Sequence, residues 1–291
     1  MESGQPGGFY VCDKCGATAP AGSAPIGANH ERPYFLPARG VNSAPKRCNG
    51  TQRPVFLGYQ FGTDVLLMHI PLRSPFLFDL TRRETRPALL SALNSLANAL
   101  ALTAASELDV DARELQCGIR LQRRAQGDSF ADVYIYDTLA GGAGYSRLVG
   151  TRFQEIFSAA VERLEACSCD SSCTNCLRTY GNRMLHASLN RHLAIDLAQY
   201  SEHGRPPALY DLAVQRQRLA PLKSMLELDE WNVASTGGAA FEIVKAGARH
   251  SLILTPSLFD QQSVPAEWQD AIAFSQYDID NDLPSCLLKI P

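Results

Sequence analysis

The stretch CSCDSSCTNC, residues 167–176, places four cysteines in ten positions and decides how the middle of this chain folds. Its spacing, C-x-C-x3-C-x2-C, lets short turns gather four thiolates around one tetrahedral metal ion, at about 2.3 Å from each sulfur. Four thiolates leave no open position for water, so the pattern predicts a closed, structural zinc site. An iron–sulfur cluster is the alternative, because four cysteines hold that group as well. The predicted ligands are Cys167, Cys169, Cys173 and Cys176.

A second set of metal-binding residues lies near the N-terminus. Cys12 and Cys15 form a C-x2-C turn in YVCDKCG, and Cys48 follows in KRCNG. Three thiolates need a fourth ligand, and His30, in the loop between the two turns, is the candidate. The alternative for His30 is a solvated loop histidine. The sequence therefore predicts a second zinc ion.

Composition narrows the class of protein. The chain has 291 residues, 45% of them hydrophobic and 20% charged, which is enough for a full globular core. Its net charge of −3 argues against a free-standing nucleic-acid binder with a wholly positive surface. The most apolar segment, residues 89–105, is interrupted by polar side chains, so we expect no membrane span. The N-terminal residues lack the features of a secretory signal, which predicts a cytoplasmic protein.

In a reducing compartment, the nine cysteines indicate metal binding rather than a disulfide framework. Seven of them lie in the two sets above. The other two, Cys117 and Cys286, sit in apolar, strand-like runs, and we interpret them as core thiols.

The remaining pattern predicts an α/β protein in three parts. Residues 1–54, rich in Gly, Pro, Ala and Asn, form a loop-rich zinc knuckle. Residues 55–204 form a mixed sheet with long helices and include the four-cysteine cluster. The break GRPP begins at residue 204 and precedes a small α/β unit, residues 205–291.

Individual elements follow from hydrophobic periodicity. In the middle part we expect strands within 54–72, a helix around 89–100, a hairpin of 114–123 with 129–138, and helices at 145–166 and 189–200. In the last part we expect a helix at 210–226, a strand at 231–234, a helix at 239–246, a strand at 251–255, then a short helix and a final strand, SCLLKI.

The glycine-rich loop DTLAGGAGY, residues 137–145, is similar to strand-to-helix turns that bind phosphate. It matches no nucleotide-hydrolase motif, and the chain contains no Gly-Lys pair, so we expect no ATP hydrolysis. Tight packing of helix on strand, permitted by Gly142 and Gly144, is the alternative role of the loop. Asp64 and Asp137 could hold a metal ion in a nuclease or phosphodiesterase, or could cap turns and helices.

Two groups of arginines are candidates for contacts with nucleic-acid phosphates. They are Arg178, Arg183 and Arg191 after the cysteine cluster, and Arg120, Arg123 and Arg124 on the predicted hairpin. Tyr180 and Asn182 lie between the first three. A solvated basic face is the alternative for both groups.

The order of LGYQFGTDVL, YDTLAGGAGYSRL, CSCDSSCTNCLRTYGN and LNRHLAIDLAQY resembles a known domain family. This zinc-binding family follows the motor in superfamily 2 helicases of the mitomycin-repair-factor-A type, and it forms part of the DrmB subunit of the DISARM anti-phage system. The resemblance covers residues 9–200, and the cysteine run followed by LRTYGN is its most specific part.

The resemblance implies that the four clustered cysteines are the family's metal ligands. It also implies an accessory role beside a helicase motor on DNA. The chain contains no Walker motif and starts with its own methionine, so we expect a separate subunit, or an excised piece, of a helicase-containing defence complex, with no catalytic activity of its own. The competing hypothesis is the metal-dependent nuclease built on Asp64, Asp137 and the glycine loop.

Overall fold

The computed structural model describes residues 8–20, 27, 29–33, 47–56, 60–83, 86–123 and 128–291. It contains helices, several small sheets and two clusters of metal-binding side chains, so the α/β class predicted from the sequence is confirmed. The chain forms two compact units, Met1–Phe61 and Gly62–Pro291. Each unit is described by itself.

The first unit is built from very short strands. Strands β1 (Phe9–Cys12), β2 (Thr18–Pro20) and β5 (Gln52–Val55) form an antiparallel sheet in the order β2-β1-β5. Strands β3 (His30–Glu31) and β4 (Arg47–Cys48) pair as a separate ribbon. The buried apolar cluster of this unit consists of Cys12, Ala17 and Cys48, with Cys15 packed against it. Three of its four members are therefore candidate metal ligands.

The second unit begins with an antiparallel sheet in the order β6-β8-β7. Its strands are β6 (Val65–Leu72), β7 (Leu115–Arg123) and β8 (Ser129–Asp137). The predicted hairpin is confirmed, with β7 paired to β8 from Leu115↔Asp137 to Arg123↔Ser129. The sequence analysis expected a mixed sheet in this part, but every pairing in this sheet is antiparallel.

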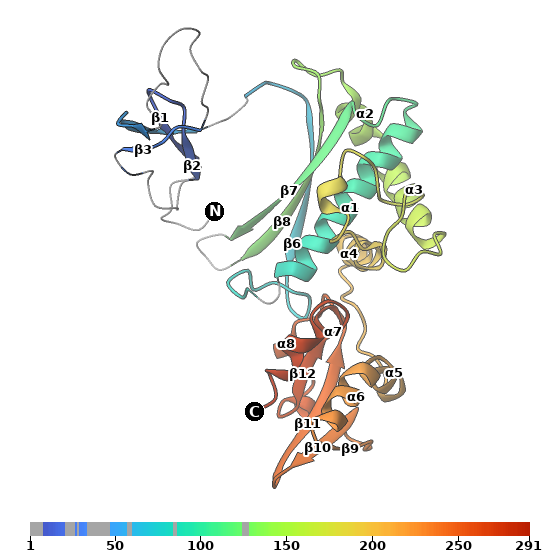
Figure 1. Ribbon diagram of the computed structural model, residues 1–291. Helices are drawn as coiled ribbons and strands as arrows, with labels where there is room; N and C mark the ends of the chain where they lie inside the picture. The colour runs from blue at the N-terminus through green and yellow to red at the C-terminus, as the bar shows by residue number, and fades with distance from the viewer. Residues whose placement is uncertain are drawn as a thin grey trace. The chain divides into compact units, whose positions relative to one another are not determined.

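Helix α1 (Arg86–Glu107) lies between this sheet and two further helices, α3 (Phe153–Glu165) and α4 (Arg191–His203) (Figure 1). It is long and apolar enough to cross a membrane by composition alone, yet 78% of that window is buried inside the protein. A helix whose surface consists mainly of alanine and leucine is a core helix when a sheet and other helices cover it. The helix predicted over 145–166 is divided at Arg152 into α2 (Tyr145–Thr151) and α3.

The last part of the second unit has its own buried cluster, which includes Leu222, Phe241 and Phe274. Its mixed sheet has the order β12-β11-β10-β9, and only β11 and β12 are parallel. The strands are β9 (Asn232–Ala234), β10 (Phe241–Lys245), β11 (Ala248–Thr255) and β12 (Ile272–Ser275). The helices are α5 (Leu212–Arg218), α6 (Ala220–Leu228), α7 (Gln276–Asn281) and α8 (Leu283–Leu287), with 3-10 turns at Arg183–Leu185, Gln261–Ser263 and Ala266–Trp268.

Two predictions for this last part are wrong. The segment predicted as a helix at 239–246 contains strand β10 instead, because Phe241 and Ile243 alternate into the core. The final segment SCLLKI, predicted as a strand, contains helix α8. The side chain of Asp282 caps that helix by accepting the N–H of Ser285, and Pro284 occupies its first turn, where proline is tolerated.

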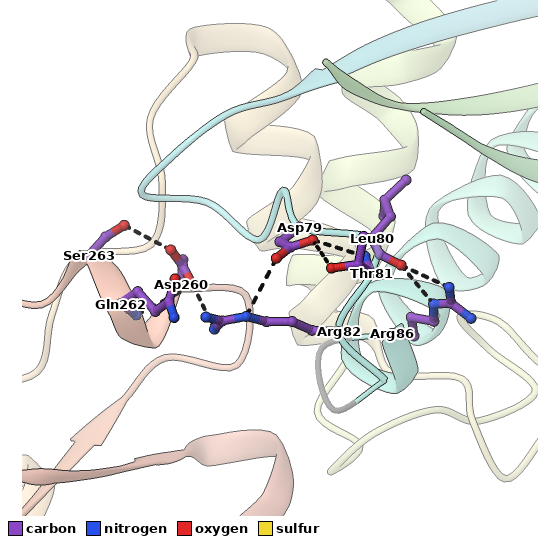
Figure 2. A network of polar contacts seen from close by, with 8 residues as sticks. All are labelled: Asp79, Leu80, Thr81, Arg82, Arg86, Asp260, Gln262 and Ser263. Atoms are coloured by element: carbon purple, nitrogen blue, oxygen red, sulfur yellow. Dashed lines mark hydrogen bonds and ion pairs between the residues drawn. The ribbon is translucent and has the colours of Figure 1, made fainter. Parts of the chain in front are cut away.

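A small network of polar contacts joins the last part to the central sheet and helices (Figure 2). The N–H of Asp260 donates to the carbonyl of Pro75 at 2.8 Å, and the guanidinium of Arg82 lies 3.7 Å from the Asp260 carboxylate. Asp79 contacts Arg82 from the other side at 3.5 Å. Both parts therefore belong to one compact unit, and the boundary predicted at residue 204 stays a proposal.

Candidate metal centres

The four clustered sulfurs lie where a tetrahedral ion requires them. The Sγ atom of Cys167 is 3.4 Å from that of Cys169 and 3.5 Å from that of Cys173. The Sγ atom of Cys176 is 3.6 Å from that of Cys169 and 3.8 Å from that of Cys173. Four sulfurs bound to one zinc at about 2.3 Å stand about 3.8 Å apart, so the spacing fits zinc without rearrangement.

The thiols of this cluster ionise unevenly. The backbone N–H of Asn175, followed by the Cys167 thiol, lowers the pKa of Cys173 to about 6. Burial raises the pKa of Cys169 to about 12 and also raises that of Cys176. One thiolate can therefore form alone, but four adjacent thiolates need a cation to offset their repulsion and desolvation. A divalent soft metal supplies that charge.

The cluster is held by the end of α3 and the start of α4. Arg191 donates from Nε to the carbonyl of Cys169 at 2.7 Å and from Nη1 to the carbonyl of Leu164 at 3.1 Å. Leu177, directly after the last cysteine, is completely buried in the main core together with Cys176. The cysteine loop is thus fixed both by the buried side chains of Cys176 and Leu177 and by the hydrogen bonds of Arg191.

The N-terminal set converges in the same way. The ligand atoms of Cys12, Cys15, His30 and Cys48 all lie within 4.8 Å of one another. The Sγ atoms of Cys12 and Cys48 are 3.8 Å apart, and Nε2 of His30 is 3.1 Å from Sγ of Cys15. Three sulfurs and one imidazole nitrogen form a closed tetrahedral zinc donor set.

His30 is buried beside the three cysteines rather than solvated. Its side chain is buried, and Nδ1 lies 3.1 Å from the carbonyl oxygen of Gly27. A carbonyl at Nδ1 selects the tautomer that carries its proton there, which leaves the lone pair of Nε2 facing the cysteines. This second contact is the usual companion of a metal-binding histidine.

Two glycines shape the turns around this site. A Cβ atom on Gly50 would lie 2.5 Å from the Sγ atom of Cys12, so only glycine lets the chain pass that sulfur. Gly16, directly after Cys15, has a φ angle of +72°, the left-handed conformation that favours glycine. The strings KCG and CNG therefore encode turn geometry as well as ligands.

The backbone N–H groups of the glycine-rich loop, residues 137–145, already bind an anionic group, the carboxylate of Asp137. The carboxylate of Asp137 accepts three backbone N–H groups, from Ala143 at 2.7 Å, Tyr145 at 3.0 Å and Ser146 at 2.7 Å. Burial alone would raise the pKa of Asp137, but these hydrogen bonds outweigh it and lower the pKa. The N–H groups that a phosphate would use are thus occupied, and this carboxylate caps the start of α2.

Asp64 lies on the other side of the same loop, where a Cβ on Gly142 would come within 2.8 Å of its Oδ2. Its Oδ1 is 3.5 Å from Nη2 of Arg147. Within the described ranges, the groups of three or more side chains able to hold a metal are the two cysteine sets. The geometry therefore favours capping and turn formation for Asp137 and gives the nuclease hypothesis no assembled site.

The candidate arginines divide by what they contact. Arg191 supports the cysteine loop, and Arg120 makes a two-pronged contact with buried Asp132, at 2.8 and 3.1 Å. Arg178 donates from Nε to the Ser172 hydroxyl at 2.9 Å. Arg183 is exposed and stacks over the ring of Tyr180 at 4.6 Å. Arg123 is exposed at the end of β7, whereas Arg124 lies outside the described residues.

Sequence reasoning did not find the parts that hold the ligands. It assigned Arg191 to contacts with nucleic acid, whereas in the structure Arg191 donates hydrogen bonds to backbone carbonyls next to the cysteine cluster. The carbonyl of Gly27, which contacts His30, was also missed. The position of Asn190 as the cap of α4 is the one signal that could have placed Arg191 inside the fold, next to the cluster.

Comparison with known proteins adds three findings. Residues 96–177 match the family model of the MrfA zinc-binding domain, a span that contains all four clustered cysteines. The chain is 33% identical over 289 residues to the Druantia protein DruE of Escherichia coli strain UMEA 4076-1, covering 95% of this chain and 16% of that protein. The chain thus spans about a sixth of the length of this relative.

Two solved structures of the DUF1998 helicase MrfA are also similar. One, bound to DNA, has a TM-score of 0.39 and 18% identity over 52% of this chain and 19% of the helicase. The other, bound to DNA and AMPPNP, has a TM-score of 0.33 and 19% identity over 48% and 17%. The family match confirms the resemblance inferred from the sequence: residues 96–177 are similar to the MrfA zinc-binding domain family.

Proposed function

We propose that this chain is a non-catalytic, zinc-stabilised accessory module that works with a superfamily 2 helicase motor on DNA, in anti-phage defence. The observation that carries the proposal is the identity of 33% to DruE along nearly the whole chain, together with the family match over the clustered cysteines. The motor is supplied either by the same polypeptide or by a partner.

In this proposal the chain holds two zinc ions, which supply folding energy rather than catalysis because neither donor set leaves a position for water. The first is held by Cys167, Cys169, Cys173 and Cys176. The second is held by Cys12, Cys15, Cys48 and His30. Supporting this, each set of ligand atoms already lies within 4.8 Å, and His30 is oriented by Gly27.

The module would help the motor to handle DNA by holding side chains against the DNA rather than by catalysing a reaction. A rigid metal loop at the junction of α3 and α4 fixes the orientation of the segment that follows it, residues 177–190. The exposed arginine of that segment, Arg183, would contact phosphates. The net charge of −3 fits a module that binds DNA together with a motor rather than alone.

The test is reconstitution with the motor. The zinc-loaded chain alone should hydrolyse no nucleotide, and its addition to the motor should change DNA-stimulated ATPase activity or DNA affinity. The variant Cys173→Ser/Cys176→Ser should weaken that effect, while Cys286→Ser, which alters a buried thiol outside both sets, should not. Unchanged helicase behaviour after disruption of both metal sites would refute the accessory role.

A further inference from the structure

A groove of about 360 Å³ opens beside the cysteine cluster, between α1, β7 and residues 179–185. Its volume lies in the range of about 300–1,000 Å³ that is typical of small-ligand sites. Small side chains of α1, Ala97 and Ala101, leave room for it. Side-chain amides of Asn94, Asn98 and Gln116 line it, so it offers both hydrogen-bond donors and acceptors.

The rim of this groove carries unusually exposed side chains. Tyr180 is 83% exposed and Met184 is 86% exposed, although both are large and partly apolar. The guanidinium of Arg183 lies 4.6 Å from the centre of the Tyr180 ring. An aromatic ring with a stacked guanidinium forms a flat cationic surface of the kind on which unpaired bases stack.

The rim is held rigidly in this arrangement. Nδ2 of Asn182 donates to the side-chain oxygen of Asn98 and to the carbonyl of Leu177, both at 2.8 Å. Its Oδ1 accepts the N–H of Thr179 at 2.8 Å. Since Leu177 is buried directly after the last cysteine, the position of Tyr180 is tied to the metal loop. A preorganised surface loses little entropy when a ligand binds.

The charges near the groove favour an anionic chain over an apolar peptide. The guanidinium of Arg183 lies against the Tyr180 ring, and Arg113 lines the groove, where Asp111 neutralises it through contacts at 2.7 and 3.0 Å. Arg183 therefore places a positive charge beside Tyr180. Amide-lined walls with an aromatic rim suit the edges and face of a nucleobase, and the arginines suit its phosphates.

We propose that this groove is the binding site for unpaired nucleobases of single-stranded DNA, with a base stacked on Tyr180 and the backbone contacted by Arg183. The inference rests on the proposed function and specifies it: the module contacts the separated strand rather than the duplex. The exposed ring of Tyr180 supplies a sequence-tolerant contact, because every base has a stacking face.

The test is fluorescence anisotropy of the zinc-loaded chain with a labelled oligothymidylate of roughly 12 nucleotides and with a blunt duplex of the same length. Tyr180→Ala should raise the Kd for the single strand by about 5- to 150-fold, which is the effect of losing one stacked base. Tyr180→Phe should retain the affinity. A 2-aminopurine base in the strand should be quenched on binding, and Tyr180→Ala should abolish that quenching.

Matched controls are Phe56→Ala, an aromatic side chain 67% exposed in the other unit, and Arg249→Ala, an exposed arginine of the last part. Both should leave the Kd unchanged, and zinc content should stay constant in every variant.

Equal affinity for single strand and duplex, or a Kd insensitive to Tyr180→Ala, would overturn the proposal. A Tyr180→Ala variant that binds the oligonucleotide normally but no longer affects the motor would identify the groove as a protein-docking site instead. Tyrosine-dependent binding by a chain that has no effect on any motor would leave the groove standing while the accessory role fails.

Discussion

The two cysteine sites have similar donor atoms but different surroundings. The cluster at residues 167–176 closes a loop whose neighbours, Leu164 and Leu177, belong to the main hydrophobic core. The N-terminal set draws its ligands from residues 12 to 48, and the buried cluster around it consists of little more than the cysteines themselves. In the proposed two-zinc form, one metal would therefore fix a loop on an existing core, whereas the other would take the place of a core.

The difference follows from how much apolar surface each region can bury. Small units without a sufficient core need a metal or disulfides to fold, because burial alone does not offset the lost chain entropy. The second unit buries α1 between a sheet and two helices and needs no such help for its bulk. Metal removal should thus unfold one region and only loosen part of the other.

The largest effect is expected for Cys48→Ser. Loss of the N-terminal zinc removes a binding free energy of about 10 kcal/mol or more, which exceeds any stability this unit has by itself. The described residues between 8 and 56 should lose all amide protection in hydrogen-exchange mass spectrometry, and zinc content should fall by one per chain. Cys286→Ser, at a buried thiol outside both sets, should lose no zinc. Persistent protection of β1 and β5 in the metal-free variant would contradict the comparison.

A smaller effect is expected for Cys173→Ser/Cys176→Ser. The free energy of unfolding of the second unit should fall by about 5 kcal/mol, because the metal loop opens while the sheet and α1 remain. Urea denaturation measures the loss, and far-ultraviolet circular dichroism should change little. Hydrogen exchange should increase in residues 166–190 and not in β8. If the whole unit unfolds, the cluster is part of its core, and the distinction between the two sites is wrong.

Gly50→Ala and Gly16→Ala test how closely the N-terminal site is packed. The new Cβ at position 50 would meet Sγ of Cys12 at 2.5 Å, whereas nothing lies within 4 Å of one at position 16. We expect Gly50→Ala to lower zinc affinity by about 10- to 100-fold, as substitutions next to metal ligands do. Gly16→Ala should cost only the strain of its positive φ, about 1–2 kcal/mol. Competition with chelators of graded strength measures both, and equal losses would show that sulfur packing is not the cause.

The sequence predicted which cysteines gather together, because residue type and spacing are local. Cys167, Cys169, Cys173 and Cys176 fall within ten residues, and the structure brings their sulfurs together. Long periodic elements such as α1 and the β7–β8 hairpin were predicted for the same reason.

Predictions were wrong where the pattern was short or the partner was distant in sequence. Five residues, Phe241–Lys245, are too few to separate a strand from a helix by periodicity. The role of Arg191 depends on the carbonyl of Cys169, 22 residues away, which no local pattern reveals. The capping interactions of Asp282 and Asp137 are short-range, and the former was overlooked because SCLLKI is a short apolar run that resembles a strand.

The junction of β8 and α2 offers an internal reference, since it closes a loop with a carboxylate instead of a metal. Asp137→Asn should lower the free energy of unfolding by about 2 kcal/mol at neutral pH, because charge-assisted hydrogen bonds to three N–H groups weaken. The pKa of Asp137 in the folded state lies below its ordinary 3.8, so the stabilisation is complete above that value and is lost as the pH falls through the lowered pKa. The difference in stability between the wild type and Asp137→Asn should therefore persist in chelator but shrink below about pH 4, whereas the effects of cysteine substitutions should vanish in chelator. Asp64→Asn, at a half-buried neighbour, should change stability by less than about 0.5 kcal/mol, and an equal loss in both variants would show that the loop is held by general charge rather than by this cap.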